Sequence, residues 1–308
     1  NDDMHREPAI AFMEKGYHIL LEKPMAPSAA DCRAINEAAH KYGVLFAVCH
    51  VLRYSPYFVR LRNIVQSGAI GEIVTVRHLE KVCYWHQAHS FVRGNWRNSE
   101  TTSPMILAKS CHDMDIMLWL ADSKCESLSS FGELSYFTEE NAPEGAPAYC
   151  LDGCPHRDEC AFYAPRFYLE NLDGYLVRAV TDQTDPEHVL EALKKGPYGR
   201  CVFHCDNTVV DHQSVDIKFE NQVTASFLMT AFTDQCARRI RQQKPSANLP
   251  ETDKPKIMVI FPLHAECQFR NPGYIWICQC LHYTFFASAS PKSPVQHIIN
   301  GSSPVFIC

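Results

Sequence analysis

The sequence predicts an α/β fold in which a small parallel sheet precedes an α+β domain with a mostly antiparallel sheet. Two observations carry this prediction. Residues 1–50 alternate helix, strand, helix, strand, and strands that alternate with helices usually pair in parallel. By contrast, Thr208–Phe219 and Gln222–Phe232 alternate polar and apolar residues on either side of Glu220-Asn221, a pattern typical of an antiparallel hairpin.

The first fifty residues divide into four elements. Pro8 and Gly16 fit the start and the end of a first helix. Ser28, with Asp31 three residues later, predicts the N-terminal cap of a second helix. The apolar runs beside these helices are short and fit buried parallel strands. We therefore expect a helix at 7–16, a strand at 19–21, a helix at 28–43 and a strand at 44–49.

The tripeptide Glu22-Lys23-Pro24 marks the end of the first strand. Pro24 cannot donate a hydrogen bond to a sheet, so the strand should stop there. Glu22 and Lys23 then lie at the carboxyl edge of the sheet, where open α/β sheets bind ligands. A lysine at this edge is either a solvated end charge or a residue of a binding site.

Three further motifs accompany this tripeptide: Asn1-Asp2-Asp3-Met4-His5, Arg53-Tyr54-Ser55-Pro56, and a helix that reads from His112-Asp113 to Trp119-Leu120. Together they resemble the Gfo/Idh/MocA family of NAD(P)-dependent oxidoreductases, from Asn1 to about Arg241. The resemblance implies a Rossmann-like first domain in which Glu-Lys-Pro closes the nicotinamide side. It also implies that NAD or NADP is bound by His5, Glu22, Lys23, Pro24 and Arg53.

In the family, a glycine-rich phosphate loop precedes the Glu-Lys-Pro element, and this sequence contains no GxGxxG. We therefore expect a partial Rossmann-like sheet in an N-terminally truncated chain. The expected organisation is a remnant of the NAD(P)-binding domain at 1–53 and a Gfo/Idh/MocA-like C-terminal domain for substrate binding and oligomerisation at 54–241. An irregular tail, unrelated to the family, follows at 242–308.

The second domain should begin with a helix from Ser55 to Gly68, followed by a strand at 72–80. Residues 84–103 are polar and aromatic and predict a loop. Such a loop either covers a sugar-sized site, with Trp96 as a substrate contact, or is an ordinary surface excursion. A continuous helix is predicted from Pro104 to Leu120.

Lys109 and His112 are the acid/base candidates of the second domain. They lie three residues apart, so they should project from the same side of the predicted helix. Many members of the resembled family carry an Asp four residues before the histidine, where this chain has Ala108. Lys109 is then the candidate replacement in the proton relay. The predicted catalytic residues are Lys23, His112 as the main acid/base group, and Lys109 in an assisting role.

His212 lies in the middle of a predicted antiparallel strand. A polar residue in that position needs a partner. His212 is therefore either a substrate contact, if its face of the sheet points to the cleft, or a satisfied sheet histidine.

The fifteen cysteines are spread through apolar elements, which favours the reduced thiols of a cytoplasmic protein over a disulfide framework. Cys150, Cys154 and Cys160 have the donor type of a tetrahedral zinc site, although their spacing is not that of a standard zinc finger. A fourth ligand could be His156, Cys201 or Cys205. The alternative is a cysteine-rich turn without metal.

The formal net charge of -6 argues against nucleic acid as a partner, and no apolar run is long enough to span a membrane. The resemblance implies hydride transfer between NAD(P) and the CH–OH or C=O group of a sugar or cyclitol, by a homo-oligomer. Two alternatives remain: a catalytically inactive remnant that acts as a scaffold, and a metal-binding module built on the cysteine cluster.

Overall fold

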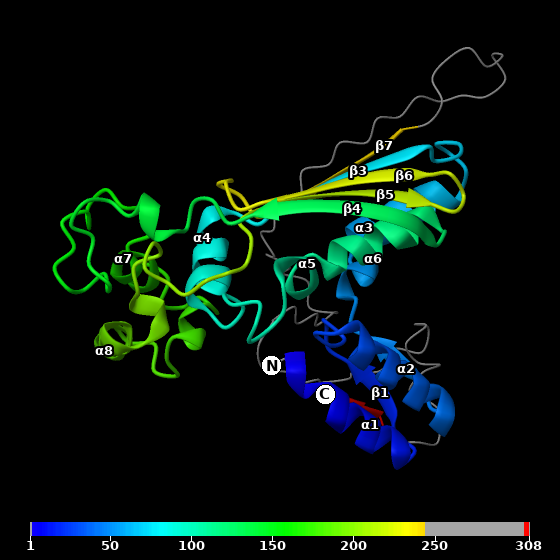
Figure 1. Ribbon diagram of the computed structural model, residues 1–308, viewed down its shortest axis with the longest axis horizontal. Helices are drawn as coiled ribbons and strands as arrows, with labels where there is room; N and C mark the ends of the chain where they lie inside the picture. Colours follow the sequence, from blue (N-terminus) through cyan, green and yellow to red (C-terminus); the bar gives the residue numbers. More distant parts are fainter. Residues whose placement is uncertain (1, 244–304, 308) are drawn as a thin grey trace, which may run out of the picture. The chain divides into compact units, whose positions relative to one another are not determined.

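The computed structural model describes residues 2–243 and 305–307 of the chain, and they separate into two compact units. The first unit contains the residues up to Cys49 together with Val305–Ile307. The second contains the described residues from His50 onward. Figure 1 shows the elements of both units, and each unit is described by itself below.

The first unit is a three-stranded parallel sheet with two α-helices. The strand order is β2-β1-β8, and both pairings of β1 are parallel. Ser28 caps the second helix by accepting a hydrogen bond from the backbone of Asp31, and Gly43 ends it in the left-handed conformation. The elements are η1 (Asp2–Met4), α1 (Arg6–Glu14), β1 (His18–Leu21), α2 (Ala29–Tyr42), β2 (Phe46–Val48) and β8 (Val305–Ile307). The parallel sheet predicted for the first fifty residues is confirmed.

The segment expected to be an irregular tail begins inside a strand. Strand β7 (Ala237–Gln243) continues past residue 241, and Val305–Ile307 pairs with β1. The rest of that expectation concerns 244–304 and 308, which lie outside the described residues.

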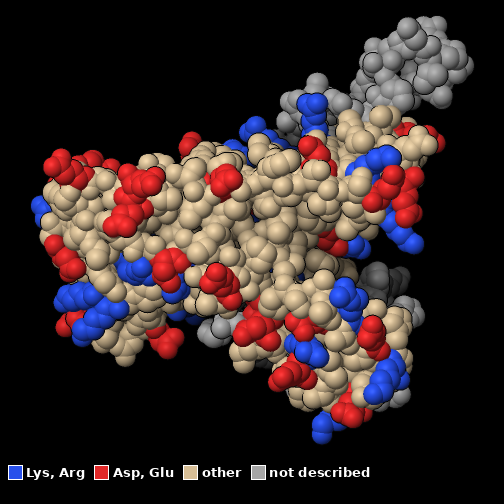
Figure 2. Space-filling model, viewed as in Figure 1, with Lys and Arg blue, Asp and Glu red and all other residues tan. Residues whose placement is uncertain are grey.

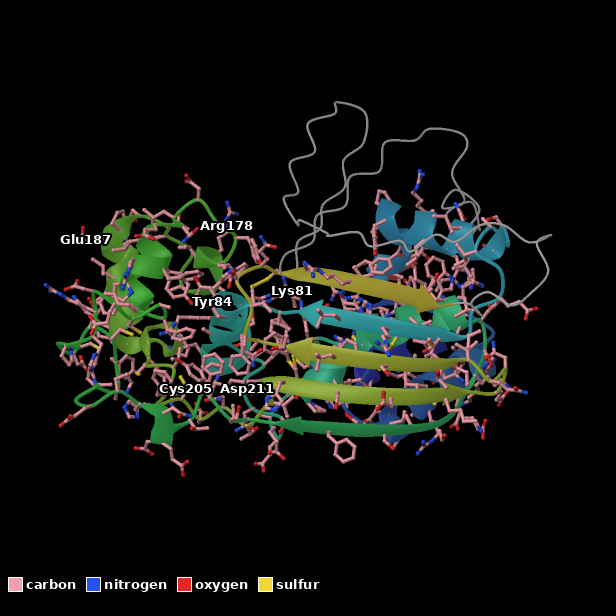
Figure 3. All side chains as sticks on the ribbon, turned by 90° about the horizontal axis from the view of Figure 1, so that it is seen from above. Lys81, Tyr84, Arg178, Glu187, Cys205 and Asp211 are labelled. Carbon is pink, nitrogen blue, oxygen red and sulfur yellow. A yellow bond between two sulfur atoms is a disulfide. The ribbon has the colours of Figure 1, made fainter. Side chains whose placement is uncertain are left out.

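The second unit is built on a five-stranded sheet of order β4-β5-β6-β3-β7 (Figure 3). Neighbouring strands are antiparallel, except that β3 and β6 run parallel. The sheet is therefore mostly antiparallel, as the sequence predicts. Besides β7, its strands are β3 (Thr75–Lys81), β4 (Cys125–Glu133), β5 (His212–Phe219) and β6 (Thr224–Thr230).

Helices cover one face of this sheet (Figure 1). The covering elements are η2 (Val51–Tyr54), α3 (Pro56–Gln66), α5 (Met105–Ala108) and α6 (Cys111–Ala121). Their apolar side chains pack against inward-facing residues of the strands, and the core includes Phe58, Ile116, Leu120, Val215 and Phe227. Because side chains alternate along a strand, residues such as Arg77, Asp216 and Phe131 point to the opposite face, where Phe131 is 76% exposed.

The predicted loop at 84–103 is wrong over its first half. Tyr84–His86 forms helix α4, and Gln87–Arg93 continues as the π-helical segment η3, in which every residue is buried. Its polar side chains are typical of a loop in the sequence, but in the fold they form hydrogen bonds with residues from other elements. His89, for example, lies 2.8 Å from the hydroxyl of Tyr168 through Nδ1, and burial lowers its pKa to about 4.

A lobe of short helices contacts η3. It contains η4 (Glu139–Asn141), α7 (Ala164–Leu169), η5 (Val177–Ala179), α8 (Pro186–Lys195) and η6 (Pro197–Gly199). Helix α8 begins at Pro186, because the Asp185 side chain accepts hydrogen bonds from the backbone of Glu187 and His188 and proline suits the first helical position. Acidic and basic side chains are interspersed over the visible surface (Figure 2).

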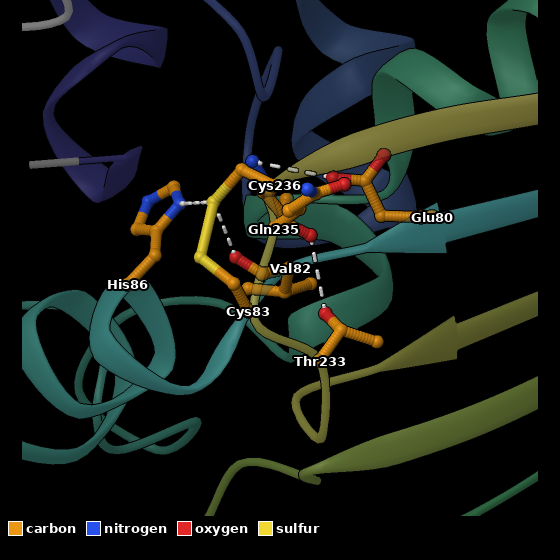
Figure 4. Close-up of a disulfide and its surroundings, with 8 residues drawn as sticks. Glu80, Val82, Cys83, His86, Thr233, Gln235 and Cys236 are labelled. Atoms are coloured by element: carbon orange, nitrogen blue, oxygen red, sulfur yellow. Dashed lines mark hydrogen bonds and ion pairs between the residues drawn. A yellow bond between two sulfur atoms is a disulfide. The ribbon is translucent and has the colours of Figure 1, made fainter. Parts of the chain in front are cut away.

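Cys83 and Cys236 form a disulfide (Figure 4). Cys83 follows β3, and Cys236 immediately precedes β7. The bond therefore joins two neighbouring strands that are far apart in the sequence. The expectation of reduced thiols is wrong for this pair, because the two residues meet only in the folded sheet. Over the part of the chain that the structure describes, no helix has the length and apolar character to cross a membrane.

The apolar face of α6 gives a direct test of this packing. Ile116 is fully buried, whereas Leu118 on the same helix is 39% exposed. Ile116→Ala should lower the free energy of unfolding by about 2–5 kcal/mol, because it leaves a cavity against the sheet. Leu118→Ala is the matched control and should cost much less. Urea denaturation of both variants measures the difference, and equal losses would contradict the orientation of α6.

Candidate functional site

The predicted catalytic residues fall in both units, with Lys23 in the first and His112 and Lys109 in the second. In the first unit, Glu22-Lys23-Pro24 follows β1 directly, as predicted. The ring Nδ1 of His5 donates to the backbone carbonyl of Pro24 at 2.9 Å. The structure thus brings His5 and the Glu-Lys-Pro element together at the carboxyl end of β1.

Glu22 lies beside Cys49, which follows β2. Burial, and then the neighbouring Glu22 carboxylate, raise the pKa of the Cys49 thiol to about 12. The backbone N–H of Lys23 donates to Glu22 Oε2 at 3.3 Å. The ends of β1 and β2 therefore lie next to each other at this edge, which is the arrangement that open parallel sheets use for ligand binding.

In the second unit, His112 lies in the first turn of α6 and is 9% exposed. Its ring meets the ring of His50 edge-on, with 6.0 Å between the centroids. One turn later, Asp115 accepts two hydrogen bonds from Arg53, at 2.7 and 2.6 Å. His50 Nε2 lies 3.9 Å from Asp115. His50, Arg53 and Asp115 thus frame His112.

The Arg53 side chain, which pairs with Asp115 beside His112, also contacts an aromatic ring. The Arg53 guanidinium stands 5.6 Å from the centre of the Trp119 ring, and Arg62 lies at the same distance. Arg53 was predicted as a cofactor contact, and the structure places it in this ion pair with Asp115. His50 is not among the predicted site residues, although it directly follows a predicted strand, just as Glu22 does.

Lys109 occupies a different environment from the one predicted. The expected continuous helix over 104–120 is wrong, because α5 ends at Ala108 and α6 begins at Cys111. Lys109 lies in the break, and its Nζ is 3.4 Å from Glu80 Oε1 on β3. The ammonium group is therefore held by a buried carboxylate beneath α6.

Glu80 belongs to a buried charged network between α6 and the sheet. Arg238 stands opposite Glu80 in the β3–β7 pairing, with 2.5 Å between Arg238 Nε and Glu80 Oε2. The same Nε donates to Asp113 Oδ1 at 2.7 Å, and His78 Nε2 donates to that oxygen at 2.5 Å. His78 also stacks on Phe227. The carboxylates of Glu80 and Asp113 thus face two cations, Arg238 and Lys109.

Burial alone would raise the pKa of Asp113, but Arg238 and His78 outweigh it and hold that pKa well below its ordinary value. Burial raises the pKa of Glu80. His78, Glu80 and Asp113 have donor atoms within 4.8 Å of one another and could in principle hold a metal ion. Arg238 already occupies the space between the two carboxylates and disfavours a further cation, so we interpret the network as a structural link.

The remaining predicted site residues lie elsewhere in the second unit. Trp96 packs beside Phe91 at the edge of the main core. The His212 ring is bonded to Asp211, 2.7 Å away, and lies on the face of the sheet that the helices leave open. The structure therefore does not bring His212 together with His112. Cys150, Cys154 and Cys160 line one pocket, which they share with Cys201.

A small parallel α/β unit is thus followed by an α+β unit with a mostly antiparallel sheet. Residues 1–50 match the family described as "Oxidoreductase family, NAD-binding Rossmann fold". Residues 58–149 match the family described as "GFO/IDH/MocA C-terminal domain". Over these two stretches the chain is similar to the Gfo/Idh/MocA oxidoreductase family.

Individual relatives agree with this assignment. The Bacillus subtilis protein YteT is 25% identical over 230 residues, covering 73% of this chain and 52% of that protein. Inositol 2-dehydrogenase of Salmonella typhimurium is 26% identical over 42% of this chain and 36% of the enzyme. 1,5-Anhydro-D-fructose reductase of Ensifer adhaerens is 30% identical over 42% of this chain and 38% of the enzyme. The chain spans about half the length, or less, of these curated relatives.

Among solved structures, an oxidoreductase domain protein from Kribbella flavida shares the fold. The match has a TM-score of 0.51 at 20% identity and covers 78% of this chain and 50% of that one.

The charged network should stabilise the second unit in a pH-dependent way. Because the folded pKa of Asp113 is depressed, its contribution is present above the ordinary value of about 3.9 and is lost as the pH falls below it. Asp113→Asn should cost about 3–5 kcal/mol at neutral pH, since it leaves Arg238 without its carboxylate.

Asp216→Asn, on the open face of the sheet, is the control and should change the stability by less than about 0.5 kcal/mol. Urea titrations at several pH values measure both. A loss for Asp113→Asn no larger than that of the control would rule out the network as a stabilising link.

Proposed function

We propose that this chain carries the catalytic residues of an NAD(P)-dependent oxidoreductase that interconverts the CH–OH and C=O groups of a sugar or cyclitol. The observation that carries the proposal is His112, buried at the start of α6 and framed by His50 and the Arg53–Asp115 ion pair. The relatives whose names include inositol and anhydrofructose support this substrate class.

The first unit fits the nicotinamide end of a dinucleotide. Its sheet is parallel, and Glu22, Lys23 and Pro24 follow β1 at the carboxyl edge, with His5 bonded to Pro24. When bound, NAD(P) supplies the hydride acceptor or donor. Lys23 would orient cofactor and substrate by its charge, and His5, Glu22 and Pro24 would line the same edge.

In the second unit, His112 handles the hydroxyl proton. In the oxidising direction, the alcohol O–H gives its proton to the imidazole as the C–H bond gives up its hydride; in reduction, the imidazolium returns the proton to the oxygen. A histidine suits this role because its ordinary pKa lies near neutrality. The Arg53–Asp115 ion pair fixes the turn of α6 that follows His112. Lys109, tied to Glu80, acts by supporting α6 from below.

The open face of the five-stranded sheet is the proposed surface for a homo-oligomer. Phe131 and Leu228 point outward there, with 76% and 47% of their surfaces exposed. Exposed apolar patches mark interaction sites, and the family resemblance implies that one face of this sheet is buried between subunits.

Replacement of His112 tests the acid/base role. The chain is assayed for NAD(P)-linked oxidation of myo-inositol and scyllo-inositol and for reduction of 1,5-anhydro-D-fructose. His112→Asn should lower kcat about 10²–10⁴-fold while cofactor binding is kept, because only the proton transfer is lost. His188→Asn, at an exposed histidine of α8, should leave the rate unchanged. Full activity in His112→Asn would refute the assignment.

Cofactor binding separates an oxidoreductase from an inactive scaffold. NADH and NADPH are titrated into the chain while nicotinamide fluorescence is followed. Lys23→Ala should weaken binding about tenfold or more, because it removes a charged contact. Lys15→Ala, at an exposed residue that follows α1, should leave the affinity for the cofactor unchanged. The absence of binding by the unmodified chain at millimolar cofactor would favour the scaffold.

A further inference from the structure

Four cysteines converge on one pocket of the second unit. Cys150, Cys154 and Cys160 come from a single segment, and Cys201 comes from the residues after η6. The four side chains therefore meet around one cavity, although Cys201 is distant in the sequence from the other three.

The segment that carries three of these cysteines has no regular structure of its own. Between η4, which ends at Asn141, and α7, which begins at Ala164, all residues are described and none lies in a helix or strand. Tyr149 and Arg200 form an isolated antiparallel bridge. Structureless segments longer than about 15 residues are uncommon in compact domains, so this one calls for a specific source of stability.

The bridge places Cys150 and Cys201 on adjacent backbones. The N–H of Cys150 donates to Gly199 at 2.9 Å, and the N–H of Cys201 donates to Ala148 at 2.8 Å. The main chain therefore holds the first and last of the four cysteines, which are distant in the sequence, at diagonal positions of one short bridge.

His156 also lines the pocket, but both of its ring nitrogens already have partners. His156 Nδ1 lies 3.1 Å from Glu159, and its Nε2 lies 2.9 Å from the carbonyl of Glu144. Cys205 does not line the pocket, and its thiol donates to the backbone oxygen of Cys201 at 3.2 Å. Of the three possible fourth donors in the sequence, Cys201 is the one that the fold delivers.

One buried cation lies beside the cysteines of the pocket. Arg93, 2% exposed, points a guanidinium N–H at Cys150 Sγ over 3.7 Å. Two carbonyls, each at 2.7 Å, hold this cation in place.

We propose that Cys150, Cys154, Cys160 and Cys201 bind one zinc ion as a tetrahedral tetrathiolate site. Each thiol gives its proton to solvent as its sulfur bonds the metal. Four thiolates around Zn²⁺ leave a net charge of about -2, and Arg93 offsets part of it. The site is structural, because four protein ligands leave no position open for a substrate.

Metal binding requires small adjustments of the side chains. Among the described residues, the donors that already lie within 4.8 Å of one another are those of His78, Glu80 and Asp113, so the four sulfurs surround the pocket at wider spacing. Rotation about χ1 between staggered wells moves a cysteine sulfur without moving the backbone. Zinc then ties residues 150–160 to Cys201 and adds to the hydrogen bonds that hold this segment.

Metal analysis of the purified 308-residue chain tests the proposal. We expect about one zinc per chain, and release of that zinc in step with titration of the thiols by a mercurial reagent. Cobalt(II) in place of zinc should give the visible bands and the thiolate charge-transfer absorption of a tetrahedral sulfur site. These three measurements need no variant and hold even if the variants misfold.

Variants then identify the ligands. Cys150→Ser and Cys201→Ser should lose the zinc, whereas Cys205→Ser and His156→Asn should keep it. Zinc retained in Cys201→Ser, or lost equally in Cys205→Ser, would overturn the ligand set. A chain without stoichiometric zinc, a chain with iron instead, or disulfide bonds among the four cysteines by mass spectrometry would overturn the site itself.

Discussion

The ion pair between Asp113 of α6 and Arg238 of β7 is the interaction on which the second unit depends. A carboxylate with no exposed surface is costly unless it is paired and fully hydrogen-bonded, and Arg238 and His78 meet that need. Glu80 faces Arg238 across the β3–β7 pairing, and Lys109 completes the network from the break before α6. The network therefore sets both the position and the rotation of α6 on the sheet.

The orientation of His112 follows from that anchor. Successive residues of an α-helix point about 100° apart, so when Asp113 is bound to the sheet His112 turns away from it, toward His50. The Arg53–Asp115 ion pair then holds the next turn from the other side. Two ion pairs on two faces of a short helix thus define the environment of a single imidazole, and neither of them uses His112 itself.

The sequence predicted the local features well and the long-range ones poorly. The strand before Glu22-Lys23-Pro24, the cap at Ser28 and the hairpin at Glu220-Asn221 each depend on neighbouring residues, and the structure confirms them. The pairing of Glu80 with Arg238 depends on which strand lies beside β3, and no local pattern encodes that.

The same reason explains the remaining differences. The helical segment at 84–93 reads as a loop because its polar side chains find partners such as Tyr168 only in the folded protein. The sequence left His156, Cys201 and Cys205 open as a fourth donor beside Cys150, Cys154 and Cys160. Only the fold, through the bridge at Tyr149 and Arg200, brings Cys201 to the pocket that these cysteines line. The sequence predicts Lys109 and His112 on one continuous helix, because Lys109 and Ser110, where the helix breaks, include no glycine or proline that would indicate a helix end.

A double-mutant cycle on Asp113 and Arg238 tests the central claim most directly. The free energies of unfolding are measured for the unmodified chain, Asp113→Asn, Arg238→Gln and the double variant. The account predicts a coupling energy of about 1–3 kcal/mol between the two side chains. A coupling of zero, with the two single losses simply adding, would show that the two residues do not act as one network and that the position of His112 is set by something else.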